Sequence, residues 1–303
     1  MTATHFVTDG GLETDLIFHH GFDLPEFAAF PLLDDERGRG VLAGYYAGYA
    51  AIAASHGAGL QLDTPTWRAN PDWGARVGHD AEALAAVNAA AVGFLREVAG
   101  EWADRVPEIR VSGQVGPRGD GYVPGAAVDP DEAAAYHQPQ VTAFAEAGAD
   151  LVSALTLSDV GEAVGVVRAA REAGVPVLVS FTVETDGRLP TGLTLAEALA
   201  ATDAAAPPDS FMVNCAHPDH VARGLAEDGP WERVHGLRVN ASDLSHEELD
   251  AMTELDDGDP GALATAHARL EELFPAVTVV GGCCGTDTRH VEAIWATRPT
   301  LRG

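Results

Sequence analysis

Short apolar segments rich in β-branched residues alternate along this chain with longer, Ala-rich segments whose apolar positions recur at helical spacing. The short segments predict buried strands and the longer ones predict helices. Eight strands are predicted, at His5–Asp9, Gly59–Thr64, Ile109–Val115, Leu151–Thr156, Val175–Thr182, Ser210–Cys215, Gly236–Ala241 and Val277–Cys283. The clearest predicted helices are Asp80–Val98, Asp131–Gly148, Ser158–Gly174, Thr194–Ala205 and Asp259–Phe274.

Residues typical of helix ends agree with these boundaries. Pro130 followed by the acidic Asp131 is typical of a first helical turn. The pairs Ala147-Gly148 and Ala173-Gly174 are typical of C-terminal ends, where glycine adopts the left-handed conformation. The alternation of strand and helix is therefore well marked in the middle of the chain.

Eight strands separated by helix-sized segments within 303 residues predict a (β/α)₈ barrel, or TIM barrel. We expect a single domain over residues 1–303, because no linker interrupts the alternation; two smaller domains are the alternative. A doubly wound sheet fits the same alternation. Such a sheet usually has a GxGxxG turn after its first strand, and the segment Asp9–Glu13 (DGGLE) lacks that pattern.

The charge balance narrows the classes of function. Asp and Glu number 46 against 18 basic residues, which gives a net charge of −28, and every basic residue is an arginine. The absence of lysine excludes Schiff-base and P-loop chemistry. The negative charge disfavours nucleic acid as a partner, because a phosphate backbone would be repelled. We interpret the acidity as a feature of solubility or salt adaptation.

We expect no membrane partner, because we find no segment of the sequence that is long and apolar enough to span a bilayer. The first residues lack the basic and apolar regions of a secretory signal, so the expected location is cytoplasmic. The expected partners are therefore small molecules, and a homo-oligomer is compatible with the sequence.

The three cysteines stand at the ends of predicted strands. Cys215 ends one strand, and Cys283 and Cys284 end another. Because the C-terminal ends of barrel strands meet on one rim, three soft thiolates are expected to converge there and form a zinc site. Glycines at 281, 282 and 285 would let the backbone approach the metal. The alternatives are a packed, apolar role for Cys215 and a vicinal disulfide between Cys283 and Cys284.

A zinc ion with three protein ligands keeps an open fourth position, which is typical of catalytic sites. Three thiolates leave the ion with a net charge of about −1, so it is a weak activator of water and a good holder of a fourth thiolate. A bound thiol would ionise below its free pKa of about 8.5. The sequence thus favours thiol alkylation. The alternatives are a metal-dependent hydrolase on the same barrel and a non-catalytic zinc or redox-sensing protein. His217 and His220 are spare candidates for metal ligands, with hydrogen-bonding residues of a loop as the alternative.

Six segments resemble motifs of the homocysteine S-methyltransferase family, which includes betaine- and S-methylmethionine-dependent enzymes. They are Asp9–Thr14, Thr64–Asn70, Gly116–Asp120, Ser180–Thr182, Val213–Cys215 and Gly281–Gly285. The last, GGCCG, is the most specific of them. The resemblance implies a (β/α)₈ barrel, Zn²⁺ bound by Cys215, Cys283 and Cys284, and methyl transfer to a thiol such as homocysteine, a step of methionine biosynthesis.

Four polar residues are candidates to act on the substrate. We predict that Asp9 and Thr64, at the ends of the first two strands, take part in catalysis and orient substrate groups, together with Asn240. Asp9 is the strongest candidate, although an Asp before two glycines also serves as a turn residue. Arg68 is predicted to clamp a substrate carboxylate, with a surface ion pair as the alternative.

Leu155 departs from the family pattern. Members resembling this chain have a Glu there, and it binds the amino group of homocysteine, which a leucine cannot do. One interpretation is that another acid, such as Asp9 or Asp159, pairs with the ammonium ion. The other is that the acceptor is a different thiol. An unpaired buried ammonium is costly, so Leu155 predicts that homocysteine is a poor acceptor unless another acid replaces the Glu.

The methyl donor is expected to be a small sulfonium or ammonium compound. A chain of 303 residues has no room for separate cobalamin and folate domains beside a barrel. Trp67 or Tyr45 could hold such a cation on its ring face.

Overall fold

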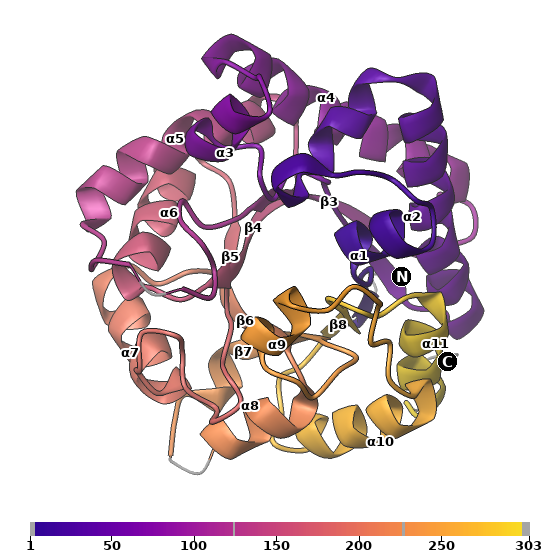
Figure 1. The fold of residues 1–303 in the computed structure, drawn as a ribbon, viewed down its shortest axis with the longest axis vertical. Helices are drawn as coiled ribbons and strands as arrows, with labels where there is room; N and C mark the ends of the chain where they lie inside the picture. The colour runs from indigo at the N-terminus through magenta and orange to yellow at the C-terminus, as the bar shows by residue number, and fades with distance from the viewer. Residues whose placement is uncertain (1–3, 124, 226–227, 299–303) are drawn as a thin grey trace.

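The eight strands close into one parallel barrel in chain order, so the predicted (β/α)₈ fold is confirmed (Figure 1). The computed structural model describes residues 4–123, 125–225 and 228–298. The strands are β1 (Phe6–Val7), β2 (Gly59–Asp63), β3 (Ile109–Val115), β4 (Leu151–Leu157), β5 (Val177–Phe181), β6 (Ser210–Ala216), β7 (Val234–Val239) and β8 (Val279–Gly282). Pairing of Phe6 with Val279 closes the barrel between β1 and β8.

The helices of the described residues surround the strands (Figure 1). They are α1 (Leu12–Phe18), α2 (Glu36–His56), α3 (Pro71–Arg76), α4 (Ala81–Trp102), α5 (Pro130–Glu146), α6 (Val160–Ala173), α7 (Leu195–Ala205), α8 (Pro218–Gly224), α9 (His246–Asp250), α10 (Pro260–Glu271) and α11 (Thr288–Ala296). Short 3-10 turns occupy Pro25–Phe27, Phe30–Asp34 and Trp231–Arg233. In Figure 1, α1 and α9 lie inside the ring of outer helices, over the barrel.

Every predicted strand is present, with changes at the ends. The first strand is shorter than predicted, although Thr8 N donates to Val280 O and Gly282 N donates to Asp9 O beyond its regular part. The seventh strand starts at Val234 and ends at Val239. Beyond Val239 the chain no longer pairs as a strand, and Ala241 N donates to the carbonyl of Cys284 instead. The ends of β1 and β7 are therefore held against the cysteine-bearing turn after β8.

The predicted helices are present with shifts of a few residues. Helix α5 begins at Pro130, where the Asp129 side chain accepts from two backbone amides, and α6 ends at the left-handed Gly174, as expected. The 21-residue α2 was not predicted, because glycines recur inside it and weaken its helical pattern. Asp35 caps its N-terminus and a left-handed Gly57 ends it.

Helix α4 corrects one expectation, since its length and composition would suffice to cross a membrane. Its apolar side chains instead pack between the helix and its neighbours on the outside of the barrel. Residues such as Leu84, Val92, Phe94 and Leu95 are buried, and the helix packs against β3 and α5. The helix is therefore part of the outer layer of the fold.

The barrel interior has an apolar end and a polar end. Phe6, Leu178, Met212 and Val279 fill the N-terminal end. One step along each strand, the inward side chains are polar: Thr8, Asp63, Ser112, Ser153, Ser180, Asn214 and Arg238 are all buried. This polar layer lies just below the C-terminal rim, where barrel enzymes place their active sites.

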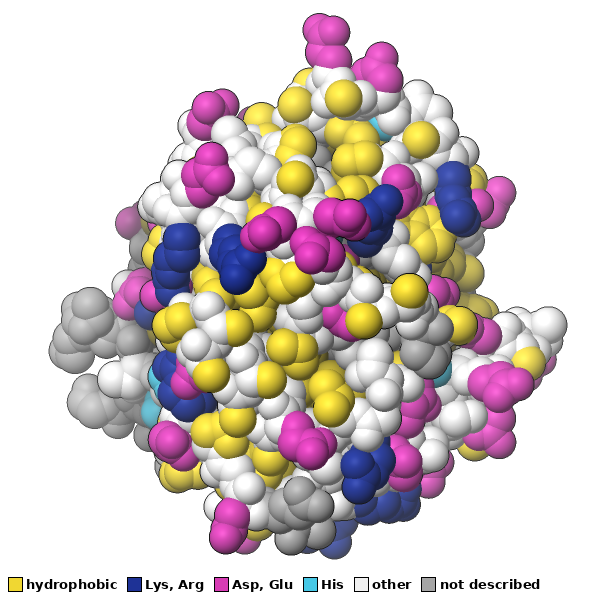
Figure 2. Space-filling model, turned by 90° about the vertical axis from the view of Figure 1, so that its left-hand side faces the viewer, with side chains coloured by type: hydrophobic (Ala, Val, Ile, Leu, Met, Phe, Trp, Pro, Cys, Tyr) yellow, Lys and Arg dark blue, Asp and Glu magenta, His cyan; other side chains and the backbone are white. Residues whose placement is uncertain are grey.

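On the face shown in Figure 2, acidic side chains are spread among apolar ones, with arginines beside some of them. The exposed ion pairs include Arg168 with Asp131 at 2.6 Å and Arg171 with Asp209 at 2.8 Å. Exposed pairs of this kind contribute only about 0–1 kcal/mol each. The charge that bears on function is inside the barrel.

Candidate metal and substrate site

The three cysteines converge on the C-terminal rim, as the sequence predicted. The sulfur atoms of Cys215, Cys283 and Cys284 all lie within 4.8 Å of one another, and Cys215 Sγ is 3.5 Å from Cys284 Sγ. Three sulfurs bound at about 2.3 Å to one tetrahedral zinc ion would lie about 3.8 Å apart. The spacing and the soft donor atoms therefore fit a metal bound by three thiolates.

The backbone at Cys215 is unusual and orients its thiol. Cys215 has a φ of +57°, in the left-handed region that side chains seldom adopt, and the pairing of β6 with β7 shifts between Asn214 and Ala216. The bulge breaks the strand alternation that would otherwise fix the direction of this side chain. Strained backbone of this kind is typical of functional sites.

Cys283 and Cys284 lie on the turn that follows β8. The Cys283 amide donates to Val239 O at 2.8 Å, and Gly285 continues the turn with a φ of +77°. At Gly282, an added Cβ would lie 1.9 Å from the Thr286 hydroxyl, so only glycine fits there. The glycines predicted to admit a metal thus allow the close packing of the turn that presents the two thiols.

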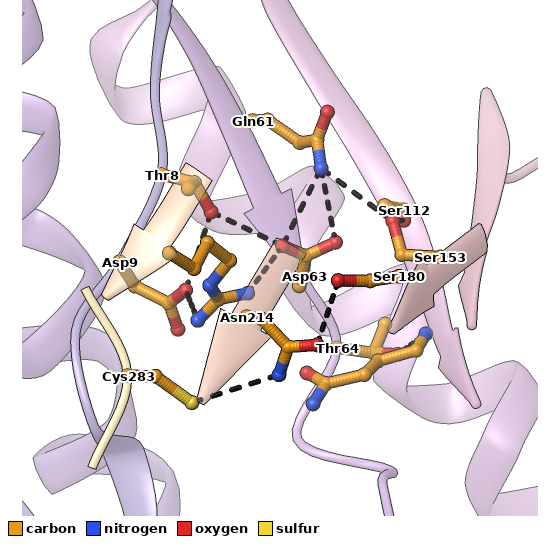
Figure 3. Close-up of polar contacts among 12 residues, drawn as sticks. Thr8, Asp9, Gln61, Asp63, Thr64, Ser112, Ser153, Ser180, Asn214 and Cys283 are labelled. Atoms are coloured by element: carbon orange, nitrogen blue, oxygen red, sulfur yellow. Dashed lines mark hydrogen bonds and ion pairs between the residues drawn. The ribbon is translucent and has the colours of Figure 1, made fainter. Parts of the chain in front are cut away.

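Asn214 connects the cysteine cluster to two neighbouring strands (Figure 3). Its side-chain oxygen accepts from Ser180 Oγ at 2.6 Å and from the Thr156 amide at 2.8 Å. Its side-chain nitrogen donates to Thr156 Oγ1 and lies 3.7 Å from Cys283 Sγ. Thr156 is itself left-handed, at a bulge of β4. Asn214 therefore ties the bulged ends of β4 and β6 together beside the sulfurs.

Tyr122 and His246 contact Cys215 and were not identified from the sequence. The Tyr122 hydroxyl lies 2.9 Å from Cys215 Sγ. His246 Nε2 donates to the Cys215 carbonyl at 2.8 Å, its Nδ1 lies 2.9 Å from Glu184, and its ring stacks on Tyr122 at 3.9 Å. Tyr122 lies in the loop after β3 and His246 begins the short helix α9, and neither position carries a spacing signal in the sequence.

Hydrogen bonds within this group shift its proton equilibria. Hydrogen bonds from Cys283 and Cys284 hold the pKa of Cys215 well below its usual range, and the same contacts raise the pKa of Cys284. Burial alone would lower the pKa of His246, but its bonds to Cys215 and Glu184 raise it to about 10. Cys215 is thus the sulfur most readily ionised.

Two connected cavities adjoin the sulfurs. The inner cavity, about 40 Å³, is lined by the three cysteines and by residues of the barrel floor such as Asp9 and Arg238. The outer vestibule, about 390 Å³, is lined by residues of α1, α9 and the loops around them. Cys284, Trp67 and Tyr122 line both. A ligand in the vestibule would therefore reach the sulfurs past these side chains.

Asp9 lies at the floor of the inner cavity, as predicted, but it is paired. Arg238 donates to Asp9, to Asp63 at 2.8 Å and to the Gly282 carbonyl at 3.0 Å, and it is only 4% exposed. Tyr45 and Thr8 also donate to Asp9, and Figure 3 shows Thr8 between Asp9 and Asp63. Burial raises the pKa of Asp9 to about 6, against the opposing effect of Arg238.

Arg238 was missed from the sequence, although a charge in the middle of an apolar strand was a usable signal. A fully buried guanidinium requires a buried partner. Asp63, near the end of another apolar strand, carried the same signal. We define Arg238, Asp9 and Asp63 as the floor cluster.

Thr64 and Leu155 are both buried, with different surroundings. The Thr64 hydroxyl lies 2.6 Å from that of Thr66 and accepts from the Gln114 amide at 2.8 Å. It does not line the inner cavity or the vestibule, so the structure gives Thr64 the task of holding the ends of β2 and β3 together. Leu155 does line the inner cavity, as its place in the sequence implied.

Arg68 and Asn240 both line the vestibule. Arg68 is 7% exposed, so the alternative of a surface ion pair is wrong. Its guanidinium stacks between Trp67 and Trp73, at 4.0 and 3.7 Å from the ring centres, and donates to the Gly119 carbonyl. Burial lowers its pKa to about 10. Among the described residues, Arg68 Nε and Asn240 Oδ1 are buried polar atoms without a hydrogen-bond partner.

Four other candidates lie outside this arrangement. His217 caps α8, and His220 Nε2 donates to the Asp243 carbonyl, so neither is placed as a metal ligand. Asp159 caps α6 by accepting from the Glu162 amide. Tyr45 is buried with its hydroxyl on Asp9 and does not line the vestibule, whereas Trp67 does.

Comparisons with known proteins identify a family and agree with the barrel fold. A family model described as homocysteine S-methyltransferase matches residues 6–297. A curated protein, homocysteine S-methyltransferase YbgG of Bacillus subtilis (strain 168), is 24% identical over 205 residues, which are 65% of this chain. The matched part spans 64% of that protein's length.

Solved structures of the homocysteine methyltransferase MmuM from Escherichia coli share the fold. The oxidised form superposes with a TM-score of 0.77 at 20% identity, and the metallated form with 0.75 at 19%. Each match covers 97% of this chain and 96% of the other. The likeness extends over the whole barrel.

Proposed function

Because this chain belongs to the homocysteine S-methyltransferase family, we propose that it transfers a methyl group from a small cationic donor to the thiol of homocysteine or a closely related amino acid. The observation that carries the proposal is the convergence of three cysteine sulfurs at the inner end of a vestibule on the barrel rim. A cluster of three thiols facing a cavity leaves room for a fourth sulfur beside it.

Cys215, Cys283 and Cys284 would hold a Zn²⁺ ion. When bound, zinc lowers the pKa of the acceptor thiol, so that the sulfur is a nucleophile at neutral pH. Asn214 and Tyr122 hold the cysteines in place through their contacts with Cys283 and Cys215. His246, fixed by Glu184, adds positive charge beside the anionic sulfurs.

The vestibule offers groups for both reactants. Arg68 is a buried cation without a carboxylate partner among the described residues, which suits it to hold a substrate carboxylate. The unpaired Asn240 side-chain oxygen can accept from a donor or acceptor N–H group.

A cationic methyl donor suits the rest of the vestibule. Trp67, Phe18 and Phe27 supply aromatic rings, and the acidic side chains at its edge are Asp120, Asp250, Glu254 and Asp256. Aromatic faces and carboxylates attract sulfonium and ammonium groups. The transfer itself is a displacement: the acceptor sulfur forms the new bond to the methyl carbon, and the donor sulfur or nitrogen leaves with the bonding electron pair.

The test is a matrix of thiols and donors with the zinc-loaded protein. S-methylmethionine and betaine are each offered with homocysteine, cysteine and thiols lacking an amino or a carboxyl group, and methylated product is measured by mass spectrometry. Methylation of an amino-acid thiol by one donor is the expected result. No methylation of any thiol, together with hydrolysis of esters or amides, would instead favour the hydrolase. X-ray absorption dominated by nitrogen ligands would contradict zinc on three cysteines.

A further inference from the structure

One half-buried carboxylate of the inner cavity has no partner among the described residues. Glu13 lines that cavity together with the three cysteines and Leu155. Among the described residues, its side chain makes no hydrogen bond or ion pair with another residue; its only bond is to its own backbone amide. Burial raises the pKa of Glu13 to about 7, although its own backbone amide and the positive charges of Arg238 and Arg68 act in the opposite direction.

The turn before α1 places Glu13 in the cavity. Gly10 and Gly11 follow β1, and at Gly11 an added Cβ would lie 2.7 Å from the Cys283 carbonyl and 3.1 Å from Cys284 Cα. The chain therefore passes directly against the cysteine-bearing turn before the helix begins at Leu12. Glu13, the second residue of α1, enters the same cavity from that side.

Asp9 and Asp159, the acids first considered for an ammonium partner, are already engaged, and so are Asp63 and Asp120. Asp9 and Asp63 share the Arg238 guanidinium in the floor cluster. Asp159 caps α6, and Asp120 accepts from the amides of Tyr122 and Val123. Glu13 is thus the carboxylate of the inner cavity that remains available.

We propose that Glu13 binds the ammonium group of the amino-acid acceptor, an inference that rests on the proposed function. The acceptor sulfur lies at the cysteine cluster, its ammonium group at Glu13 and its carboxylate at Arg68. Glu13 and Arg68 influence one another electrostatically without forming an ion pair, which leaves both for a zwitterion. A zwitterion supplies one charge of each sign, so Glu13 and Arg68 are neutralised together.

This assignment explains why an apolar residue is tolerated at 155. Leu155 is 3% exposed and its carbonyl accepts from Trp67 Nε1 at 3.2 Å. With the ammonium group at Glu13, the Leu155 side chain forms an apolar wall for the acceptor's methylene groups. The acid function has moved from the end of β4 to the first turn of α1, and homocysteine becomes an acceptable substrate.

The test compares homocysteine with 4-mercaptobutanoate, which is homocysteine without its amino group. The zinc-loaded full chain is assayed with the donor found above, and kcat/KM is measured for each thiol. Glu13→Gln is expected to lower the ratio of kcat/KM for homocysteine to kcat/KM for 4-mercaptobutanoate by at least about 30-fold. That change corresponds to about 2 kcal/mol at 1.4 kcal/mol per decade. Most of that loss should appear in KM for homocysteine, and Glu13→Asp should keep part of the preference.

Asp15→Asn is the matched control. Asp15 lies on the same helix, and its carboxylate pairs with His19 and His20 outside the cavity. This variant should keep the ratio of the wild type. Adding Leu155→Glu to Glu13→Gln should restore much of the preference for homocysteine, because an acid would again line the same cavity.

Two results would overturn the inference: a wild type that does not distinguish the two thiols, or a Glu13→Gln variant that keeps the wild-type ratio. Failure of the proposed function looks different, since the wild type would then methylate neither thiol. Calorimetry of homocysteine binding to the zinc-loaded protein still tests Glu13 in that case. Binding should weaken at least about 30-fold in Glu13→Gln, and equal binding by both proteins would contradict the assignment.

Discussion

Two sets of charged side chains lie near the cysteine cluster, and the fold provides partners for one set and not for the other. In the floor cluster, Arg238 contacts Asp9, Asp63 and two backbone carbonyls, and each carboxylate has further hydrogen-bond donors. At the cavity, Glu13 and Arg68 have no opposite charge bound to them among the described residues. The first set is satisfied within the protein, and the second is satisfied only when a ligand arrives.

The difference separates residues that hold the barrel from residues that bind. A buried charge pair is strongly destabilising to break, because the remaining charge loses its partner. A buried charge left unpaired lowers stability in the free protein, and such sites cluster where a ligand restores the balance. Mutations in the floor cluster should therefore lower the free energy of unfolding, whereas mutations of the cavity residues should weaken ligand binding.

The largest expected effect is at Arg238. Arg238→Met leaves Asp9 and Asp63 buried without a cation, so the free energy of unfolding should fall by about 3–5 kcal/mol. Urea unfolding followed by circular dichroism measures it. The matched control is Arg118→Met, which removes an exposed partner of Asp72 and should cost less than about 1 kcal/mol. If the two variants lost the same free energy of unfolding, the floor cluster would contribute no more to stability than an exposed ion pair.

That loss should be recovered in part when the carboxylates are neutralised. Combining Arg238→Met with Asp9→Asn and Asp63→Asn removes all three charges together, and amide side chains can keep several of the hydrogen bonds. The triple variant should unfold at a higher urea concentration than Arg238→Met alone. A further loss would show that packing of the guanidinium, not charge pairing, holds this layer.

Mutations in the cysteine cluster, like those of the cavity residues, should affect binding more than the free energy of unfolding. Cys283→Ser is expected to lower zinc affinity by at least about 100-fold, because even residues that only support a metal ligand contribute 10–100-fold. The zinc-free barrel should unfold with nearly unchanged free energy, since the thiol lies on a rim turn and not in the core. Zinc content by mass spectrometry, with urea unfolding beside it, gives both quantities. The same change at Cys215 tests its role: full zinc content would make Cys215 a packed strand residue.

Glu13 should make the stability of the ligand-free protein depend on pH. Its pKa is raised from an ordinary 4.5 to about 7, so the folded state binds the proton more tightly than the unfolded state. The resulting stabilisation is present below about pH 4.5 and is lost as the pH rises through 7. Asp9, Arg238 and Arg68 are the charged groups that face it.

Glu13→Gln should therefore be more stable than the wild type at pH 8, by about 2 kcal/mol. This is less than the full pKa shift would give, because part of the carboxyl faces the cavity. The two proteins should converge near pH 4.5. Unfolding curves at several pH values, without ligand, measure this. A variant that is less stable than the wild type at pH 8 would mean that Glu13 has a partner inside the protein.

The smallest expected effect is Leu155→Glu in the otherwise unchanged chain. With Glu13 present, a second acid has no ammonium group left to bind, so kcat/KM for homocysteine should rise by less than about threefold. The same substitution should help strongly only when Glu13 is changed to Gln. A large gain in the unchanged chain would support the interpretation, drawn from Leu155 alone, that homocysteine is a poor acceptor.

The sequence by itself determined the architecture and the position of the cysteine cluster. Strand and helix periodicities are local, so eight strands could be counted, and parallel strands bring their C-terminal ends to one rim. That was enough to place Cys215 beside Cys283 and Cys284 across 68 residues. The Cys-Cys pair between glycines also indicated a turn, which the structure has after β8.

Only the tertiary structure decided which polar residues are free. Arg238 meets Asp63 across 175 positions and Asp9 across 229, because the stagger of the closed barrel brings their strands into one layer. That pairing removed Asp9 from the candidates for an ammonium partner. Glu13 remained a candidate, because it has no such partner among the described residues. A local pattern fixes the direction in which a side chain points, but whether it meets a partner depends on distant strands. For this reason the convergence of the three cysteines could be predicted from the sequence, whereas the proposed acceptor-binding acid could not.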